Sequence, residues 1–246
     1  MKDNIDYSIY YRRWHKDTLE DMEHISLSYE HWLGNLIHQH ETSLKVLDYG
    51  CGFGGLTFFL KKYFPNIWAV DSSEQQVIVA KKYLLNVLHL PLESFTEWTT
   101  SNHNEFDIIF LIDVLEHIPV REQITFITSL TNTLKDNGII YIRVPNANSP
   151  LANRWLYNDW THYSSFTECS LEFVCLNAGL DNILYLPDIL DIKPKHWWLP
   201  TLDSLAYYIK STFRGIWRFY LLSELGKQAL KIPLGVNLFI RATKKT

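Results

Sequence analysis

Short apolar runs alternate with amphipathic stretches along the central part of the chain, residues 44–146. The run at 106–112 (FDIIFLI) is apolar almost throughout, which is typical of a parallel strand covered on both faces. The stretches at 73–86 and 120–135 have helical spacing instead. Strands that alternate with helices predict a parallel α/β sheet with right-handed crossovers. The strands predicted along the whole chain are 44–49, 67–71, 106–112, 139–144, 182–186 and 236–242.

Two further segments lack this alternation. Residues 1–43 have a helical pattern of mixed polar and aromatic residues, and residues 187–235 are aromatic and partly helical. We therefore expect an N-terminal helical cap at 1–43, a main domain made of 44–186 and 236–246, and a helical insertion or cap at 187–235. No uncharged run is long enough for a membrane-spanning helix, and the polar N-terminus has no apolar signal core, so we expect no transmembrane segment and a cytoplasmic location.

Composition adds one unusual feature, an aromatic content of 15% with nine Trp. Only Trp68 and Trp98 fall within residues 44–145, so we expect the rest to form an aromatic cap or substrate wall over one edge of the sheet. The formal net charge of −4 argues against a nucleic-acid partner. The three cysteines include no CxxC pair and predict no disulfide framework, as in a reducing compartment. The other Trp residues are Trp14, Trp32, Trp155, Trp160, Trp197, Trp198 and Trp217.

A glycine-rich loop, GCGFGG at 50–55, follows the first predicted strand and opens a helix. It matches the G-x-G-x-x-G pattern of dinucleotide sites, in which a helix N-terminus holds a pyrophosphate. Asp48 stands two residues before the loop, and its carboxylate would repel a pyrophosphate but attract a cationic ligand such as S-adenosylmethionine. The alternative is a tight turn without a ligand. The contacts that we predict for the cofactor here are Asp48, Gly50, Cys51, Gly52 and Gly54.

Asp71 ends the second predicted strand, where a carboxylate can accept hydrogen bonds from both ribose hydroxyls of either cofactor. We expect Asp71 and the adjacent Ser72 to contact the cofactor. The alternative for Asp71 is the N-cap of the following helix, together with Ser72 and Ser73.

Four sequence blocks stand in the order and spacing of class I S-adenosylmethionine-dependent methyltransferases, which the chain resembles over about residues 44–180. The resemblance implies a Rossmann-like sheet of seven strands, mostly parallel, with an antiparallel last strand at 236–242. The chain would then be an α/β protein with helical caps from its N-terminal and C-terminal parts. The four blocks are LDYGCGFGG (47–55), AVDSS (69–73), FDIIFLIDVLEHIP (106–119) and LKDNGIIYIRVPN (134–146).

The resemblance also implies roles for individual residues. Asp48 and the glycines would line the methionine end of the cofactor, and Asp71 would hold its ribose. Leu92 or Glu93 would flank the adenine, although the Asp that relatives often place there has no counterpart in this chain. Asp113 would face the cofactor or the substrate at the carboxyl edge of the sheet.

Asp113, Glu116 and His117 are spaced so that a helical turn would project all three to one side. His162 lies downstream in the segment NDWTHY. Three interpretations remain open for this group: a structural turn, a metal-free general base (His117 or His162), or an Mg²⁺ or Mn²⁺ site. The spacing resembles that of RNA 3′-end 2′-O-methyltransferases and ubiquinone-pathway O-methyltransferases. The catalytic candidates are Glu116, His117 and His162, and the metal-ligand candidates are Asp113, Glu116, His117 and His162.

A hydroxyl acceptor must lose a proton, so its methylation needs a base or a metal ion, whereas an amine or a carboxylate needs less help. The VLEHIP block and the later THYSSFT block resemble methyltransferases of bacterial capsule and O-antigen gene clusters. This resemblance implies a small-molecule or glycan acceptor, such as a sugar or a nucleotide-sugar. The alternatives are another small metabolite, an RNA ribose hydroxyl, an NAD-dependent oxidoreductase, and a non-catalytic cofactor-binding partner subunit.

Three features outside the main blocks carry further predictions. The segment YYRRW at 10–14 either closes over the cofactor or forms a solvated helix face, and Asn146 stands at an edge of the site. Within 196–221, apolar residues recur at helical spacing, which predicts a packed amphipathic helix. A peripheral membrane contact, an oligomer interface and phosphate binding by basic residues are the alternatives for that helix. The apolar residues are Ile209, Phe213, Ile216, Trp217 and Tyr220, and the basic ones are Lys210, Arg214 and Arg218.

Overall fold

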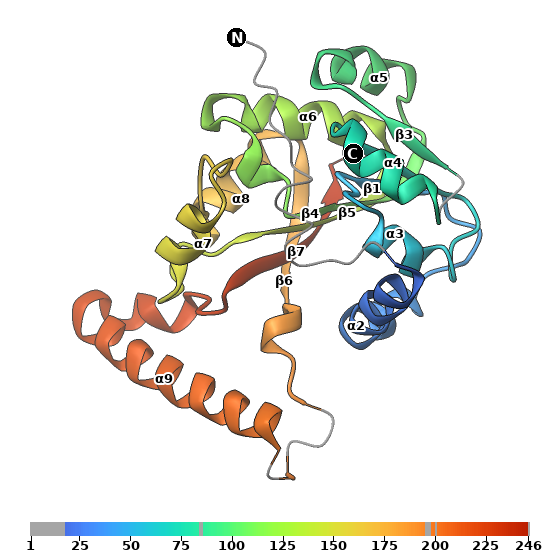
Figure 1. The fold of residues 1–246 in the computed structure, drawn as a ribbon. Coiled ribbons are helices and arrows are strands. Elements are labelled where there is room, and N and C mark those ends of the chain that lie inside the picture. The colour runs from blue at the N-terminus through green and yellow to red at the C-terminus, as the bar shows by residue number, and fades with distance from the viewer. Residues whose placement is uncertain (1–17, 84–85, 195–197, 200, 246) are drawn as a thin grey trace.

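The computed structural model describes residues 18–83, 86–194, 198–199 and 201–245 (Figure 1). Its centre is a seven-stranded sheet with the order β3-β2-β1-β4-β5-β7-β6. All strands run parallel except β7, which is antiparallel to both of its neighbours. This confirms the Rossmann-like fold that the sequence predicts. The strands are β1 (Val46–Tyr49), β2 (Ile67–Asp71), β3 (Val87–His89), β4 (Phe106–Ile112), β5 (Leu134–Pro145), β6 (Leu180–Leu186) and β7 (Asn237–Lys244).

Helices cover both faces of this sheet. On one face, α2 packs on α3, and α3 and α4 pack on β2. On the other face, α5 and α8 pack against α6, which packs on β5. The central strands β1 and β4 are almost fully buried between these layers, which explains their continuous apolar runs. The helices are α2 (Leu19–Ile37), α3 (Gly55–Leu60), α4 (Glu74–Lys81), α5 (Phe95–Ser101), α6 (Gln123–Thr133), α7 (Ala152–Asn158), α8 (Glu168–Asn177) and α9 (Leu202–Leu225).

The last strand is antiparallel, as the resemblance implies. β7 lies between β5 and β6, with Tyr141 opposite Arg241 in the β5 pairing. β5 begins earlier than expected, because Leu134 already pairs with Phe106 before the turn that the sequence predicts. The turn is present inside the strand as an irregularity, with Asn137 in the left-handed region at φ 61°.

Trp32 on α2 departs from the predicted aromatic wall. It is buried in the core, where its ring centroid lies 4.8 Å from that of Phe239 on β7. Its indole N–H donates to the carbonyl of Pro187 at 3.0 Å. Trp160 and Trp198 are instead largely exposed, at 94% and 62%. Trp14, the rest of the segment at 10–14, and Trp197 lie outside the described residues.

The predicted helix near the C-terminus is present as α9, but it does not pack through its apolar stripe. Ile209, Phe213, Ile216 and Tyr220 are each more than half exposed. The tertiary contacts of α9 come mainly from its other side, against the short helix η5 (Gly226–Lys231). Within the described ranges, no helix combines the length and the apolar character that crossing a bilayer requires.

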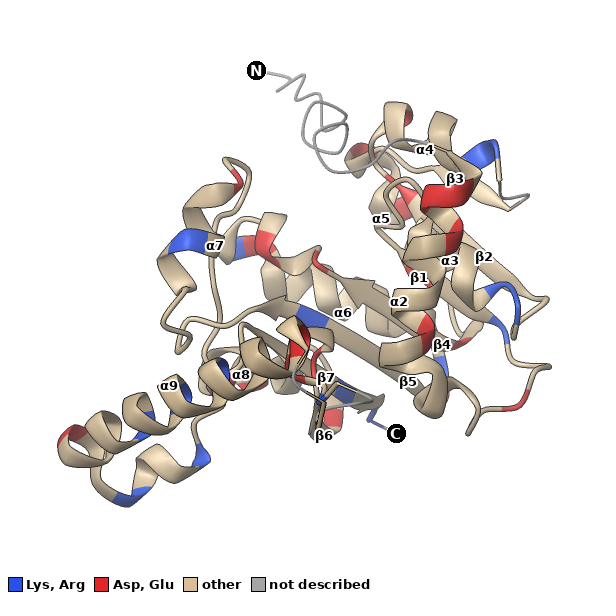
Figure 2. Cartoon of the chain, turned by 60° about the horizontal axis from the view of Figure 1, so that its bottom comes forward, with Lys and Arg blue, Asp and Glu red and all other residues tan. Residues whose placement is uncertain are grey.

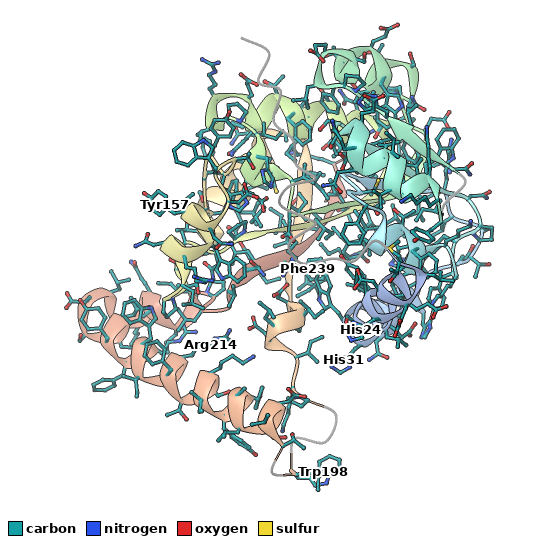
Figure 3. All side chains as sticks on the ribbon, viewed as in Figure 1. His24, His31, Tyr157, Trp198, Arg214 and Phe239 are labelled. Atoms are coloured by element: carbon teal, nitrogen blue, oxygen red, sulfur yellow. The ribbon has the colours of Figure 1, made fainter. Side chains whose placement is uncertain are left out.

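The basic residues of α9 bind this protein's own chain. Lys210 donates to the carbonyl of Leu190 at 3.0 Å, and Arg214 pairs with Asp191 at 2.6 Å. Figure 3 shows Arg214 pointing from α9 toward the body of the molecule. Arg218 donates to the carbonyl of Ile232 at 2.7 Å and to that of Ala229. These contacts account for the three side chains without a phosphate ligand.

A buried ion pair joins β5 to the segment that follows β6. Arg143 Nε lies 2.5 Å from Asp188 Oδ1, and both side chains are largely buried. Asp188 also accepts from Asn237 Nδ2 at 3.1 Å and from the backbone N–H of Leu190 at 3.3 Å. The guanidinium carbon of Arg143 lies 5.3 Å from the centroid of the Trp32 ring. One cation therefore holds together β5, β7, α2 and the turn at 188–191.

We expect Asp188→Ala to lower the free energy of unfolding by about 3–5 kcal/mol, because it leaves the largely buried Arg143 cation without its buried carboxylate partner. Urea unfolding followed by circular dichroism measures this change. Glu122→Ala is the control, since Glu122 pairs with Arg121 on the surface and should matter by less than about 1 kcal/mol. Equal small effects in the two variants would contradict the importance of the buried pair.

Candidate active site

The glycine loop leaves β1 at its carboxyl end and enters α3. The backbone N–H groups of Gly50 and Cys51 both donate to the carbonyl of Val70, at 2.9 and 3.0 Å. Gly50 has φ 75°, and a Cβ there would lie 2.4 Å from Cγ2 of Val114. Only glycine therefore fits this position. Gly54, also left-handed, is the N-cap of α3, and its N–H donates to the carbonyl of Cys51 at 2.9 Å.

Asp48 lies beneath this loop and is only 2% exposed. Its carboxylate accepts the Thr57 hydroxyl at 2.5 Å. Burial raises the pKa of Asp48 to about 7, and the nearby charge of Asp71 adds to the increase. At this depth, Asp48 acts on a ligand through its charge more than through direct contact. A cation placed over the loop would favour the ionised carboxylate.

Asp71 binds the loop from the end of β2. One carboxylate oxygen accepts from the N–H of Gly52 and the other from the N–H of Ser73, both at 2.8 Å. The N-cap of α4 is Ser73, so Asp71 supports the start of that helix without capping it. Each carboxylate oxygen can accept a further bond, so both ribose hydroxyls still find acceptors here.

The remaining predicted cofactor contacts surround this loop. Cys51 is buried, and burial raises the pKa of its thiol well above the usual range, so the thiol is neutral. Ser72 is exposed, and its carbonyl accepts from the His89 ring at 3.1 Å. Leu92 and Glu93 are exposed in a short turn, η1 (Leu92–Ser94), that follows β3. The N–H of Leu90 bonds the carbonyl of Asp71 at 2.8 Å, which keeps that turn beside the loop. The cofactor contacts of Cys51, Ser72, Leu92 and Glu93 stay predictions.

Three of the four candidate metal ligands come together after β4. One ligand atom each from Glu116, His117 and His162 lies within 4.8 Å of the other two. The rings of the two histidines have centroids 4.6 Å apart at an interplanar angle of 70°. Glu116 and His117 belong to a 3₁₀ turn, η2 (Leu115–His117), and His162 follows α7.

The structure differs from the predicted set at Asp113. This residue has φ 55°, so the chain turns sharply before η2 and no helical turn carries Asp113, Glu116 and His117 together. Its carboxylate pairs instead with Arg143 NH1 at 2.5 Å. The side chain of Asp113 is still 45% exposed, so it borders the site without joining the three ligands.

Both histidines are held with the proton on Nδ1. His162 Nδ1 lies 2.9 Å from the carbonyl of Trp155, which can only accept. His117 Nδ1 lies 2.8 Å from the Thr161 hydroxyl, whose own proton goes to Asp159 at 2.5 Å. A hydrogen bond from Nδ1 leaves Nε2 as the nitrogen that could bind a metal ion, and such bonds orient metal-binding histidines in proteins.

Glu116 completes the group as a buried carboxylate, 1% exposed. Within the part of the chain that the structure describes, its Oε2 has no hydrogen-bond partner. Burial raises the pKa of Glu116 well above its usual range. A buried carboxylate oxygen without a partner is unfavourable, so a proton or a cation is expected at this position. One ring nitrogen from each of the two histidines lies within 4.8 Å of a Glu116 carboxylate oxygen, which fits a cation.

Sequence reasoning missed the residues that support this site. Arg143 is a single charge in an apolar strand, and this was the one available signal. Asp159 and Thr161 stand beside His162 in the sequence, but their bond to His117 depends on the fold. Burial, and after it the charge of Asp113, raises the pKa of Tyr29 on α2.

Asn146, expected at an edge of the site, uses its side chain to bond the backbone near β7. It is fully buried, and its amide N–H₂ donates to the carbonyls of Pro233 and Gly235 at 2.9 and 2.8 Å. Its side-chain oxygen accepts from the N–H of Asn148 at 2.9 Å. Asn146 thus fixes the chain where it approaches β7.

Comparison with known proteins agrees with this geometry. The profile of a family described as a methyltransferase domain matches residues 22–185, which is most of the chain. The chain has the fold of a solved S-adenosylmethionine-dependent methyltransferase from Archaeoglobus fulgidus, with a TM-score of 0.64, 17% identity, and coverage of 97% of this chain and 100% of that one. This chain belongs to the methyltransferase-domain family.

The descriptions of two relatives name different methylated atoms, oxygen in one and nitrogen in the other. The ubiquinone biosynthesis O-methyltransferase of Actinobacillus pleuropneumoniae is 30% identical over 109 residues, which are 42% of this chain and 46% of that protein. N-methyltransferase 4 of Papaver somniferum is 25% identical over 201 residues, 77% of this chain and 53% of that protein. The chain spans about half the length of these two relatives.

We expect S-adenosylmethionine to bind more tightly as the pH rises through about 7, because its positive sulfonium favours the ionised form of Asp48. If the ligand lowers the pKa of Asp48 by two or more units, the Kd should fall about tenfold between about pH 6 and about pH 8. Isothermal titration calorimetry at the two pH values measures the change.

Asp48→Asn is the matched control for this measurement. It preserves the shape of the side chain but cannot ionise, so any remaining pH dependence belongs to the ligand or to other groups. An equal pH dependence in the parent protein and in Asp48→Asn would contradict the role assigned to Asp48.

Proposed function

We propose that this protein transfers the methyl group of S-adenosylmethionine to a hydroxyl group of a small acceptor. Membership of the methyltransferase-domain family supports the reaction class. The glycine loop with Asp48 and Asp71 supports a cationic nucleoside cofactor. The group formed by Glu116, His117 and His162 carries the choice of a hydroxyl acceptor, because such an acceptor must lose a proton.

The same group fits a divalent cation. One ring nitrogen of each histidine and one carboxylate oxygen of Glu116 lie within 4.8 Å of one another, while Asp113 is engaged by Arg143. A set with two imidazoles favours Mn²⁺ or another transition metal over Mg²⁺, which prefers oxygen ligands. When bound there, such an ion would supply Lewis acidity that lowers the pKa of an acceptor hydroxyl.

The surrounding residues hold the ligands in place. Thr161 and Asp159 fix the ring of His117, and the carbonyl of Trp155 fixes the ring of His162. Burial lowers the pKa of His117 to about 4, so this ring stays neutral at neutral pH. A base this weak is poorly matched to the deprotonation of a hydroxyl without a metal ion.

A sugar or nucleotide-sugar is the acceptor that we favour. Trp160 and Tyr163 flank His162 and are exposed at 94% and 60%, so they offer aromatic surfaces beside the group. The resemblance of the THYSSFT segment to capsule and O-antigen methyltransferases supports the same class. An amine acceptor is the alternative that one relative, the N-methyltransferase of Papaver somniferum, favours.

We expect the full chain to bind Mn²⁺ at one site, and His117→Ala and His162→Ala to weaken that binding at least about tenfold. Thr161→Val should weaken it by about 10–100-fold while all three ligands remain, because it releases the ring of His117. His103→Ala is the control, since His103 is exposed and precedes β4, whereas Glu116 and His117 follow that strand. Titration calorimetry with MnCl₂ measures binding without turnover.

Loss of Mn²⁺ binding in His103→Ala to the same extent, or no binding by the parent protein, would remove the metal from the proposal. Each variant must show the circular dichroism spectrum of the parent, so that a folding defect is not counted as lost binding.

A methyl-donor assay tests the acceptor class. Full-length protein with labelled S-adenosylmethionine is offered nucleotide-sugars, glycan fragments and small amines. We expect transfer to a hydroxyl acceptor, a large loss of turnover in chelator, and recovery with Mn²⁺. Transfer to amines alone would overturn the hydroxyl assignment, and thermal stabilisation by NADH but not by S-adenosylhomocysteine would overturn methyl transfer itself.

A further inference from the structure

α9 is oriented opposite to an ordinary surface helix. Its apolar residues face outward, and each of the six that form one continuous stripe is more than half exposed. Their spacing of three or four residues keeps them on one side over the whole helix. A surface helix normally turns such a stripe toward the core. The six residues are Leu202, Leu205, Ile209, Phe213, Ile216 and Tyr220.

The outward orientation is fixed by contacts on the opposite side. Lys210, Arg214 and Arg218 lie on that side and bind Leu190, Asp191 and two carbonyls near η5. The half-buried Trp217 lies between the two arginines in sequence and contacts the ring of Tyr220. Rotating the helix to bury its apolar stripe would break these bonds. The exposed stripe is therefore a stable feature of this structure.

The net charge of α9 and η5 indicates which kind of partner this surface can bind. Residues 202–231 carry five basic and two acidic side chains, a formal charge of +3 in a chain with a total of −4. Figure 2 shows the basic residues along α9 and η5. Lys227 and Lys231 are exposed on η5, which packs against α9 on the side opposite the apolar stripe. A second copy of this chain would bring like charges together, whereas an anionic lipid surface would attract them.

The shape of the helix fits a surface contact. Its 24 residues span about 36 Å, and its basic residues prevent it from entering the hydrocarbon lengthwise. Trp198, Leu199, Leu202 and Leu205 help to line a hollow of about 440 Å³ at the N-terminal end of α9. Figure 3 shows Trp198 at that end of the molecule. Trp and Tyr are favoured at the boundary between headgroups and acyl chains.

We propose that α9 docks this protein onto an anionic membrane surface. The helix lies in the plane of the interface, with the six-residue stripe among the acyl chains and with Lys227 and Lys231 near lipid phosphates. Apolar burial supplies attachment, and the local positive charge supplies the preference for anionic lipid. This docking goes beyond the proposed methyl transfer and does not depend on it.

Flotation of the full-length protein with vesicles tests the proposal. We expect it to float with vesicles of phosphatidylcholine and phosphatidylglycerol, and less with phosphatidylcholine alone or in high salt. The double variant Ile209→Glu, Phe213→Glu should lower the partition coefficient about tenfold or more, because both charges would enter the apolar layer. Lys227→Glu with Lys231→Glu should lower the preference for anionic lipid.

Phe173→Glu is the matched control, because Phe173 on α8 is as exposed as the stripe but lies outside it. It should float like the parent protein. The proposal is overturned if the parent stays unbound with both kinds of vesicle, or if Phe173→Glu loses as much binding as the α9 variant. It is also overturned if light scattering shows a dimer that the α9 variant dissociates while vesicle binding is absent. Stabilisation by S-adenosylhomocysteine should be the same in all variants, which separates this result from the proposed function.

Discussion

The guanidinium of Arg143 is the interaction on which the site most depends. It is buried between Asp188 and Asp113, and it lies over the ring of Trp32. A cation at this depth needs both carboxylates, because neither water nor the apolar strand can replace them. This pairing also affects the candidate metal site, because an Asp113 carboxylate bound to Arg143 is not available to join Glu116, His117 and His162.

Patterns of local sequence predicted six of the seven strands; the short strand β3 (Val87–His89) was not among them, and the seven-stranded order came from the family resemblance. Buried strands such as 106–112 leave a continuous apolar run, and the glycine loop needs left-handed backbone that only Gly50 can adopt beside Val114. The partners of Arg143 could not be found in this way. Asp188 lies far along the chain in a segment of no regular pattern, and only the β5–β7–β6 arrangement brings the two together.

The same limit explains the errors at Asp113 and α9. Spacing predicts which side chains share a helical face, but the segment after β4 is a 3₁₀ turn that starts beyond a left-handed residue. For α9, periodicity predicted the helix correctly, whereas the face that meets the protein was set by ion pairs with the turn at 188–191. The hydrophobic pattern therefore predicted which residues form the stripe, but not whether the stripe is buried or exposed.

The insertion between β6 and β7 joins two adjacent antiparallel strands, a connection for which a tight hairpin would be sufficient. The ends of the insertion, at Asp188 and at the carbonyls of Pro233 and Gly235, are bonded to Arg143 and Asn146 of the sheet edge. The described residues of its middle make no strand pairing, and the entropy of closing a loop grows only slowly with length. Residues 193–231 can therefore lengthen, shorten or change surface character during evolution while the register of the sheet stays the same.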